Sequence, residues 1–118
     1  MTESGPEPKL EPGLLLDQVP VAVTVLDLEG RILFYNQHAP RILDRKPSYL
    51  GQDIRRFHQP RSAAKIEGFL QTYAQGGREE FAYQIERDGF RLAVRVAPFL
   101  EQDRCQGLIQ TVMLLGPA

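Results

Sequence analysis

The Asp88-Gly89 dipeptide constrains this chain more than any other feature, because it is a strong short-range signal for a tight β-hairpin turn. Apolar side chains occupy every second position on both sides of it, with Phe81, Tyr83 and Ile85 before the turn and Phe90, Leu92, Val94 and Val96 after it. A period of two indicates strands with one buried face. The sequence therefore predicts two antiparallel strands, over residues 80–86 and 90–97.

Three more strands are predicted outside this hairpin. Residues 21–27 (VAVTVLD) are rich in β-branched side chains, which favour strands, and residues 31–36 (RILFYN) form a second apolar segment. Between them, Asp27 and Gly30 stand at the first and last positions of a four-residue turn. Residues 108–115 predict a final strand, which follows a polar turn at 102–106.

The middle of the chain predicts helices. A longer helix is expected over residues 62–75, with helix-start residues Pro60 and Ser62, helical spacing of Ile66, Phe69, Leu70 and Tyr73, and a stop at Gly76-Gly77. Shorter helical turns are expected near residues 14–19, 37–43 and 50–54. This order predicts an α+β fold: a five-stranded antiparallel sheet with several short helices and one longer helix on one face.

Length and composition fit one domain. The 118 residues divide into an acidic, proline-rich flexible tail at 1–13 and a single domain at 14–118. The formal net charge of −1 gives no argument for a nucleic-acid or membrane partner, and no apolar run reaches the ~18 residues of a membrane-spanning helix. The single Cys105 excludes an internal disulfide and a four-thiolate zinc site, and it fits a cytoplasmic protein.

These elements resemble a PAS domain over about residues 14–115. DLEGRI at 27–32 resembles the family's Asp-x-x-Gly-x-Ile turn, and Asn36 matches its Asn at the end of the second strand. YLGQDI at 49–54 resembles its Leu-Gly helix, and the Asp88-Gly89 hairpin stands where PAS domains have an Asp-Gly turn. More narrowly, FHQPRS at 57–62 is similar to the Cys-His-Pro-Pro-x-Ser segment of PAS domains joined to hemerythrin-like domains, with Phe57 in place of the reactive cysteine.

The resemblance implies a sensory or signalling domain that binds a small ligand between the concave face of the sheet and the long helix. The candidate residues of this cavity are Tyr35, Asn36, Tyr49, Phe57, His58, Ile66, Phe69, Phe81, Tyr83, Leu92 and Val94. Most of these side chains can equally form an ordinary core, so a pure interaction module without a ligand is the alternative function. No catalytic residues are predicted and we do not expect an enzyme, because the serines and Cys105 lack the surroundings of a nucleophile.

Two cofactor chemistries can be tested on the sequence. Ile54 stands where flavin photosensors of this family carry their reactive thiol, so a flavin–cysteinyl adduct is excluded. No metal site is predicted, because His38 and His58 lie twenty residues apart without metal-ligand spacing. A haem-based gas or redox sensor stays as a lesser alternative with His58 as ligand, although Ile66 occupies the family's proximal position.

Basic residues gather between positions 41 and 65. Seven Lys and Arg side chains stand there against Asp44 and Asp53, which leaves a local net charge of +5. We interpret them as a solvated surface that the acidic tail balances, because charged side chains are normally exposed. An anionic ligand or an acidic partner at the helical face is the alternative interpretation.

Self-association is the other expected property. The apolar segment at residues 14–19 must cover something, and the last strand has apolar residues on both faces. We therefore expect a homodimer through the sheet face, with Leu14, Leu15, Val19, Leu108, Val112 and Leu114 as its candidate contacts. A stand-alone cytoplasmic PAS protein with a small-molecule ligand or a signalling partner fits these features.

Overall fold

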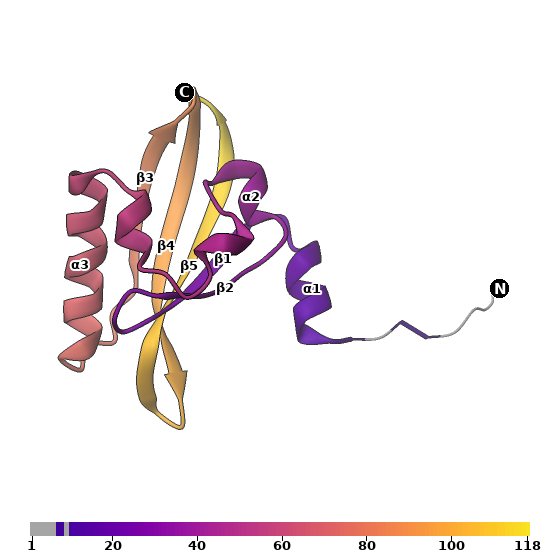
Figure 1. Ribbon diagram of the computed structural model, residues 1–118. Helices are drawn as coiled ribbons and strands as arrows, with labels where there is room; N and C mark the ends of the chain where they lie inside the picture. The colour runs from indigo at the N-terminus through magenta and orange to yellow at the C-terminus, as the bar shows by residue number, and fades with distance from the viewer. Residues whose placement is uncertain (1–6, 9) are drawn as a thin grey trace.

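The computed structural model describes residues 7–8 and 10–118, in which five strands form one sheet (Figure 1). The helices are α1 (Pro12–Gln18), α2 (Ala39–Ile42) and α3 (Pro60–Ala74), with two 3-10 turns, η1 (Pro47–Tyr49) and η2 (Ile54–Phe57). The strands are β1 (Ala22–Asp27), β2 (Ile32–Tyr35), β3 (Phe81–Arg87), β4 (Phe90–Glu101) and β5 (Arg104–Pro117). Much of the predicted tail lies outside the described residues, and none of the described helices is long and apolar enough to cross a membrane.

The strand order is β2-β1-β5-β4-β3, and every neighbouring pair is antiparallel. The central strand is β5, where Val112 pairs with Ala22 of β1 on one side and with Val94 of β4 on the other. The first hairpin therefore joins the second through the last strand of the chain. This arrangement confirms the predicted α+β fold with five antiparallel strands.

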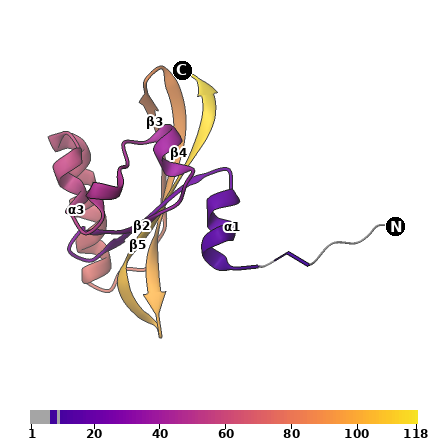
Figure 2. The ribbon, with the colours of Figure 1, turned by 45° about the vertical axis from the view of Figure 1, so that its right-hand side comes forward.

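The sheet has two faces that are covered differently. Helix α3 lies against one face, called here the inner face, and α1 lies on the opposite side of the sheet (Figures 1 and 2). Strand alternation directs Leu26, Leu108 and Val96 to the inner face, where they are almost fully buried. From α3, Ile66, Leu70 and Tyr73 complete the core against them.

The last two strands are longer than predicted. β4 and β5 continue their pairing as far as Glu101 and Arg104, into the segment that the sequence analysis placed in a polar turn. The connection needs only Gln102 and Asp103, which adopt positive φ angles of 52° and 64°. Two such residues give the tight turn that matches the twist of a hairpin, so the flanking polar residues can stay in the strands.

Candidate ligand cavity

The buried side chain of Asn36 fixes the first hairpin to the segments around it. Its amide nitrogen donates to the carbonyl oxygens of Leu16 (2.7 Å) and Val21 (2.9 Å). Its oxygen accepts from the backbone N–H groups of Val23 (2.9 Å) and Ala39 (3.2 Å). Asn36 therefore binds the end of α1, the start of β1 and the start of α2, and its role is structural.

The Asp27–Gly30 turn holds η2 in place. The Oδ1 atom of Asp27 accepts the backbone N–H of Glu29 (3.0 Å) and of Arg31 (2.9 Å), which closes the turn. Gly30 has a φ of 87°, and a Cβ there would come within 3.0 Å of the Arg55 side chain. The Gly30 carbonyl accepts the N–H of Ile54 at 2.9 Å, so the turn positions the first residue of η2.

A cavity of about 680 Å³ lies between the inner face of the sheet and the segment that runs from η2 into α3. Its apolar wall includes Leu43, Phe57, Ile66, Tyr83, Val94 and Val112. Its polar lining includes Arg45, His58, Arg61, Lys65, Arg87 and Gln110. Such a mixed wall suits a small molecule with an apolar body and a few polar groups.

Four aromatic rings form two packed pairs near the cavity. Tyr49 and Phe57 stack with their ring centroids 3.7 Å apart, and the Tyr49 hydroxyl lies 3.2 Å from Asp44 Oδ2. Phe69 packs on Phe81 with centroids 4.7 Å apart. These rings are used in packing against each other, and of the four only Phe57 lines the cavity.

His58 lines the cavity with one ring nitrogen already engaged. Its Nδ1 atom lies 2.9 Å from the carbonyl oxygen of Ile54, which leaves Nε2 without a partner among the described residues. Burial lowers the pKa of His58 from its usual value of 6.5, and the Ile54 carbonyl offsets this only in part. The ring is therefore neutral at pH 7, with Nδ1 as its donor.

Arg45 is buried in the cavity wall, with 7% of the residue exposed. Its Nε donates to Thr24 Oγ1 (3.2 Å), its Nη1 to the Asp44 carbonyl (3.0 Å) and its Nη2 to Gln110 Oε1 (3.3 Å). Burial and the nearby Arg87 cation lower the pKa of Arg45 to about 10. The guanidinium therefore stays charged at neutral pH.

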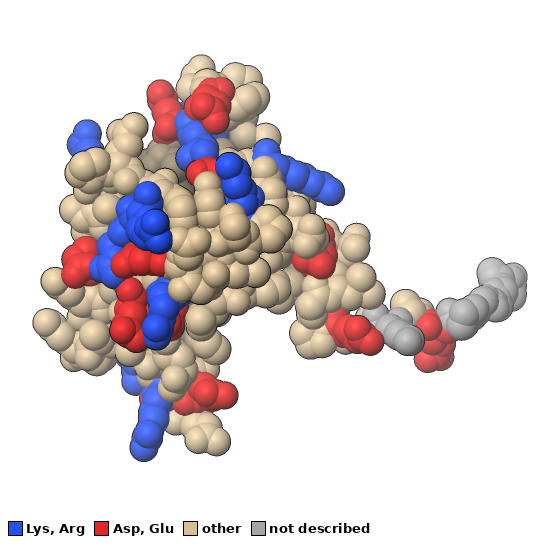
Figure 3. Space-filling model, in the orientation of Figure 1, with Lys and Arg blue, Asp and Glu red and all other residues tan. Residues whose placement is uncertain are grey.

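The other basic residues of the 41–65 segment differ from Arg45. Arg55 contacts Asp53 at 2.8 Å and also pairs with Glu67. Figure 3 shows Lys and Arg side chains lying among Asp and Glu side chains on this face of the molecule. The fold thus divides the predicted basic cluster: Arg55 forms ion pairs at the surface, Arg45 is buried, and Arg61 and Lys65 line the cavity.

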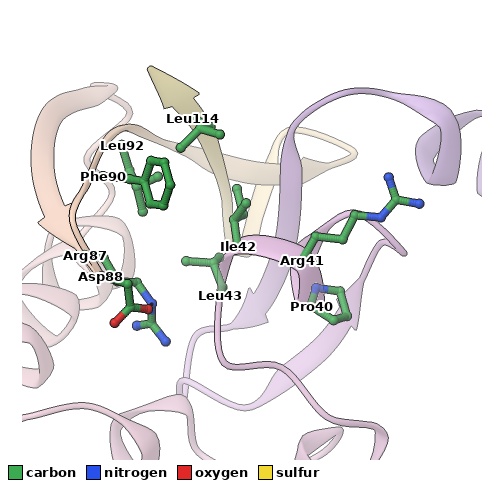
Figure 4. A pocket seen from close by; sticks show the side chains of 9 residues that line it. All are labelled: Pro40, Arg41, Ile42, Leu43, Arg87, Asp88, Phe90, Leu92 and Leu114. Carbon is green, nitrogen blue, oxygen red and sulfur yellow. Dashed lines mark ion pairs between the residues drawn. The ribbon is translucent and has the colours of Figure 1, made fainter. Parts of the chain in front are cut away.

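A second, smaller hollow of about 390 Å³ adjoins the cavity at the end of the sheet. Figure 4 shows Phe90, Leu92 and Leu114 together on one side of it, with Ile42 and Leu43 facing them from the end of α2. Arg87 and Leu43 line both hollows. Arg41, Arg87 and Asp88 also line this hollow, but its volume is much smaller, so we place the candidate site in the larger cavity.

The predicted cavity residues are only partly brought together. Phe57, His58, Ile66, Tyr83 and Val94 line the cavity, and Leu92 lines the second hollow. The prediction that Asn36 lines the cavity is wrong, because both polar atoms of its side chain bind backbone groups. Tyr35, Tyr49, Phe69 and Phe81 pack beside the core. The sequence analysis missed Arg45, Lys65, Arg87 and Gln110 as lining residues, and the only signal for the first two was the excess of positive charge.

The expected dimer contacts also need correction. Leu108 and Val112 point to the inner face, where they are 2% and 1% exposed, so neither can contact a partner. Leu114 lies on the same face and lines the second hollow. The outward positions of β5 are Ile109, Thr111 and Met113. Side chains along a strand alternate between its two faces, and the dimer contacts predicted on β5 belong to the inner face.

Helix α1 exposes its apolar residues. Leu14 and Leu15 are 49% and 44% exposed, and none of the helix is buried. The helix is held by Asn36, which donates to the Leu16 carbonyl, and by Asp17, whose Oδ1 accepts the N–H of Gln37 at 2.9 Å. An apolar surface therefore remains available on the side of the sheet away from α3 (Figure 1).

A five-stranded antiparallel sheet of order β2-β1-β5-β4-β3 with one helix across its inner face defines a class of small α+β domains. A family model described as PAS domain matches residues 13–113, and the chain therefore belongs to the PAS domain family. A search of curated protein sequences finds no significant match. Across residues 7–8 and 10–118, no three His, Cys, Asp or Glu side chains come close enough to hold a metal ion.

Solved structures share the fold at low sequence identity. The C-terminal domain of a Streptococcus mutans protein superimposes with a TM-score of 0.74 at 21% identity, covering 87% of this chain and 81% of that one. The PAS domain of BvgS from Bordetella pertussis gives 0.69 at 21% identity, with 86% and 82% covered. A sensory box sensor histidine kinase from Vibrio cholerae gives 0.62 at 15% identity, with 86% and 87% covered.

Proposed function

We propose that this PAS domain is a non-enzymatic sensory module that binds a small molecule in the cavity beneath α3. The observation that carries the proposal is the cavity itself, about 680 Å³ in volume with both apolar and charged walls. Binding sites for small molecules are typically concave, largely apolar and oriented by a few polar groups. The cavity of this domain is concave, and apolar and polar side chains share its wall in similar measure.

The central strand offers a route from the cavity to the outer face. Gln110 and Val112 of β5 line the cavity, whereas Thr111 between them points to the opposite side. A ligand that shifts the backbone at Gln110 or Val112 also shifts Thr111, which lies between them. We propose that occupancy is read at the outer face in this way.

Direct detection of a bound molecule tests the proposal. Native mass spectrometry of the purified protein, before and after denaturation, should show a small molecule released on unfolding. A purified protein that carries nothing, and whose melting temperature no metabolite mixture changes, would instead favour the pure interaction module.

We further propose that the domain forms a homodimer through α1 and the outer face. The exposed leucines of α1 and the outward Met113, which is 45% exposed, support this contact. Light scattering should give the mass of a dimer, and Leu14→Ser with Leu15→Ser should give a monomer. Leu50→Ser is a matched control, because Leu50 is equally exposed, at 48%, but belongs to the segment between η1 and η2. A monomeric parent protein at every concentration would contradict the proposal.

Haem binding stays a lesser candidate because of one observation, the uncommitted Nε2 atom of His58 in the cavity wall. The Ile54 carbonyl fixes the ring as a metal-binding histidine requires, and Arg45 could pair with an acidic substituent of the macrocycle. When bound, haem would supply gas or electron chemistry. The absorption spectrum distinguishes this candidate: a Soret band that His58→Ala removes would support it, and a colourless protein after haem addition would exclude it.

A further inference from the structure

Arg45 has hydrogen-bonding capacity that the protein does not use. A guanidinium group has five N–H donors. The three hydrogen bonds to Thr24, Asp44 and Gln110 use one donor on Nε, one on Nη1 and one on Nη2. Within the described part of the chain, nothing accepts from the two remaining donors, one on each terminal nitrogen.

The charge of Arg45 is also not neutralised within the described residues. All three of its acceptors are uncharged, and none of the ion pairs includes it. The adjacent carboxylate of Asp44 favours the Arg45 charge from a distance, but it accepts the Tyr49 hydroxyl and forms no ion pair with Arg45. A buried cation without a counter-charge is costly, and proteins normally pair such groups. Among the described residues, no anion contacts the Arg45 guanidinium, and a bound anion would supply this partner.

The surroundings of Arg45 attract an anion rather than a cation. Arg61, Lys65 and Arg87 also line the cavity, against the single carboxylate of Glu86. Strand alternation places Arg87 on the inner face beside Ile85, and Glu86 on the outer one. Lys65 Nζ lies 3.9 Å from the centre of the Tyr83 ring, over the cavity wall. His58 is neutral at pH 7 and adds no negative charge.

We propose that the ligand of this cavity is a small organic acid, whose carboxylate binds the two free donors of Arg45 while its apolar body packs on Ile66, Val94 and Val112. This inference rests on the proposed function and specifies the chemical class of the ligand. Free N–H groups on both terminal nitrogens match the two oxygens of one carboxylate, which is the typical geometry of a bidentate arginine contact. The apolar side chains of the wall favour a hydrocarbon body over a bare inorganic anion.

The experiment compares acids with their neutral amides. Ligand-free protein, refolded from denaturant, is titrated with benzoate and hexanoate, and separately with benzamide and hexanamide, while sodium chloride keeps the ionic strength constant. Inorganic phosphate is a third probe. The melting temperature and the dissociation constant are measured for each probe. Both acids should bind and raise the melting temperature, whereas the amides and phosphate should not.

Three variants locate the binding. Arg45→Gln should weaken benzoate binding by about thirtyfold or more, as expected when one partner of a buried charged pair is removed. Arg87→Glu should also abolish binding, because it places a carboxylate at the mouth of the cavity without changing a buried residue. Arg91→Glu is the matched control, since it makes the same charge change on the outer face, and it should bind benzoate like the parent protein.

The outcomes separate the two proposals. Amides that bind as well as acids, or an Arg45→Gln variant that keeps the affinity for benzoate, would overturn the organic-acid assignment and leave the ligand cavity intact. Binding of phosphate alone would overturn it too. A protein that binds no probe and releases no molecule on unfolding would overturn the proposed function itself.

Discussion

Two buried polar side chains, Asn36 and Arg45, both contact β1 but differ in how completely the protein satisfies their hydrogen bonds. Asn36 is 0% exposed, and each of its polar atoms makes two hydrogen bonds to backbone. Arg45 is almost as buried, yet two of its five donors and its charge remain without a partner in the described chain. Completed hydrogen bonding marks a structural residue, whereas incomplete hydrogen bonding marks a place where a ligand can bind.

The difference follows from position in the sheet. Asn36 lies where α1, β1 and α2 meet, so unpaired backbone groups surround it at the end of a strand. Arg45 projects toward the inner face, where the backbone groups of the sheet already bind one another. Its side-chain acceptors there are Thr24 and Gln110. Backbone groups therefore satisfy Asn36 completely, whereas they give Arg45 only one acceptor, the Asp44 carbonyl.

The largest expected effect tests the structural side of this comparison. Asn36→Ala should lower the free energy of unfolding by about 3 kcal/mol, because it leaves several buried backbone groups without partners. Urea denaturation measures the change. The neighbouring Gln37→Ala, at an exposed position, serves as the control and should change little. An equal loss in both variants would contradict the assigned role of Asn36.

A pH titration tests the electrostatics of the cavity. Burial holds the pKa of His58 below 6.5 in the folded protein, so the unfolded chain binds its proton first as pH falls. The stabilising contribution is complete above pH 6.5 and is lost as pH falls through that value towards the lower folded pKa. The slope of stability from His58 is at most about 1.4 kcal/mol for each pH unit.

The matched measurement uses His58→Gln. Chemical denaturation between pH 7.5 and 5.5 should show a smaller loss of stability in this variant than in the parent protein. Parallel curves for the two proteins would mean that His58 is hydrated in the folded state, and the position of its ring in the cavity wall would then be wrong.

Arg45→Met sharpens the comparison with Asn36. In the ligand-free protein, this substitution should change the free energy of unfolding by no more than about 1 kcal/mol, because the lost hydrogen bonds are offset by removal of an uncompensated buried charge. Urea denaturation of refolded, ligand-free protein gives the value. A loss as large as that of Asn36→Ala would show that Arg45 is mainly a structural residue.

The smallest expected effect concerns a completed pair at the surface. Arg95 of β4 and Glu80, the residue before β3, form an exposed ion pair at 2.8 Å. Glu80→Gln should change stability by no more than about 0.5 kcal/mol, since solvent screens such pairs. Thermal denaturation in low and high salt provides the check, and a larger salt-sensitive loss would show that pairing at the surface matters as much as burial.

The fold could be predicted from local signals. The Asp27–Gly30 turn, the Asp88-Gly89 hairpin and the helical spacing of Ile66, Leu70 and Tyr73 depend on neighbouring residues, which a single sequence contains. The face of β5 could not be predicted in the same way. Both sets of alternating residues in this strand are apolar, so only the register with β1 and β4 decides which set is buried.

Most of the candidate site could not be predicted from the sequence, for the same reason. Arg45 is followed by Lys46, and nothing in the local sequence distinguishes the buried cation from the exposed one. Its partners Thr24 and Gln110 lie 21 and 65 residues away in the chain. A buried charge is defined by long-range contacts, whereas the excess of basic residues in the sequence gave only an alternative interpretation.

Side chains of β5 alternate between the cavity and the outer face, so a label on the outer face could report a ligand in the cavity. Gln110 binds Arg45 inside the molecule, while Met113 lies on the outer face three residues further along the same strand. A polarity-sensitive dye attached at position 113 would lie on the exterior, on the same strand that contributes Gln110 and Val112 to the cavity wall. Its emission would then follow the concentration of whatever compound the domain recognises, without a label on that compound.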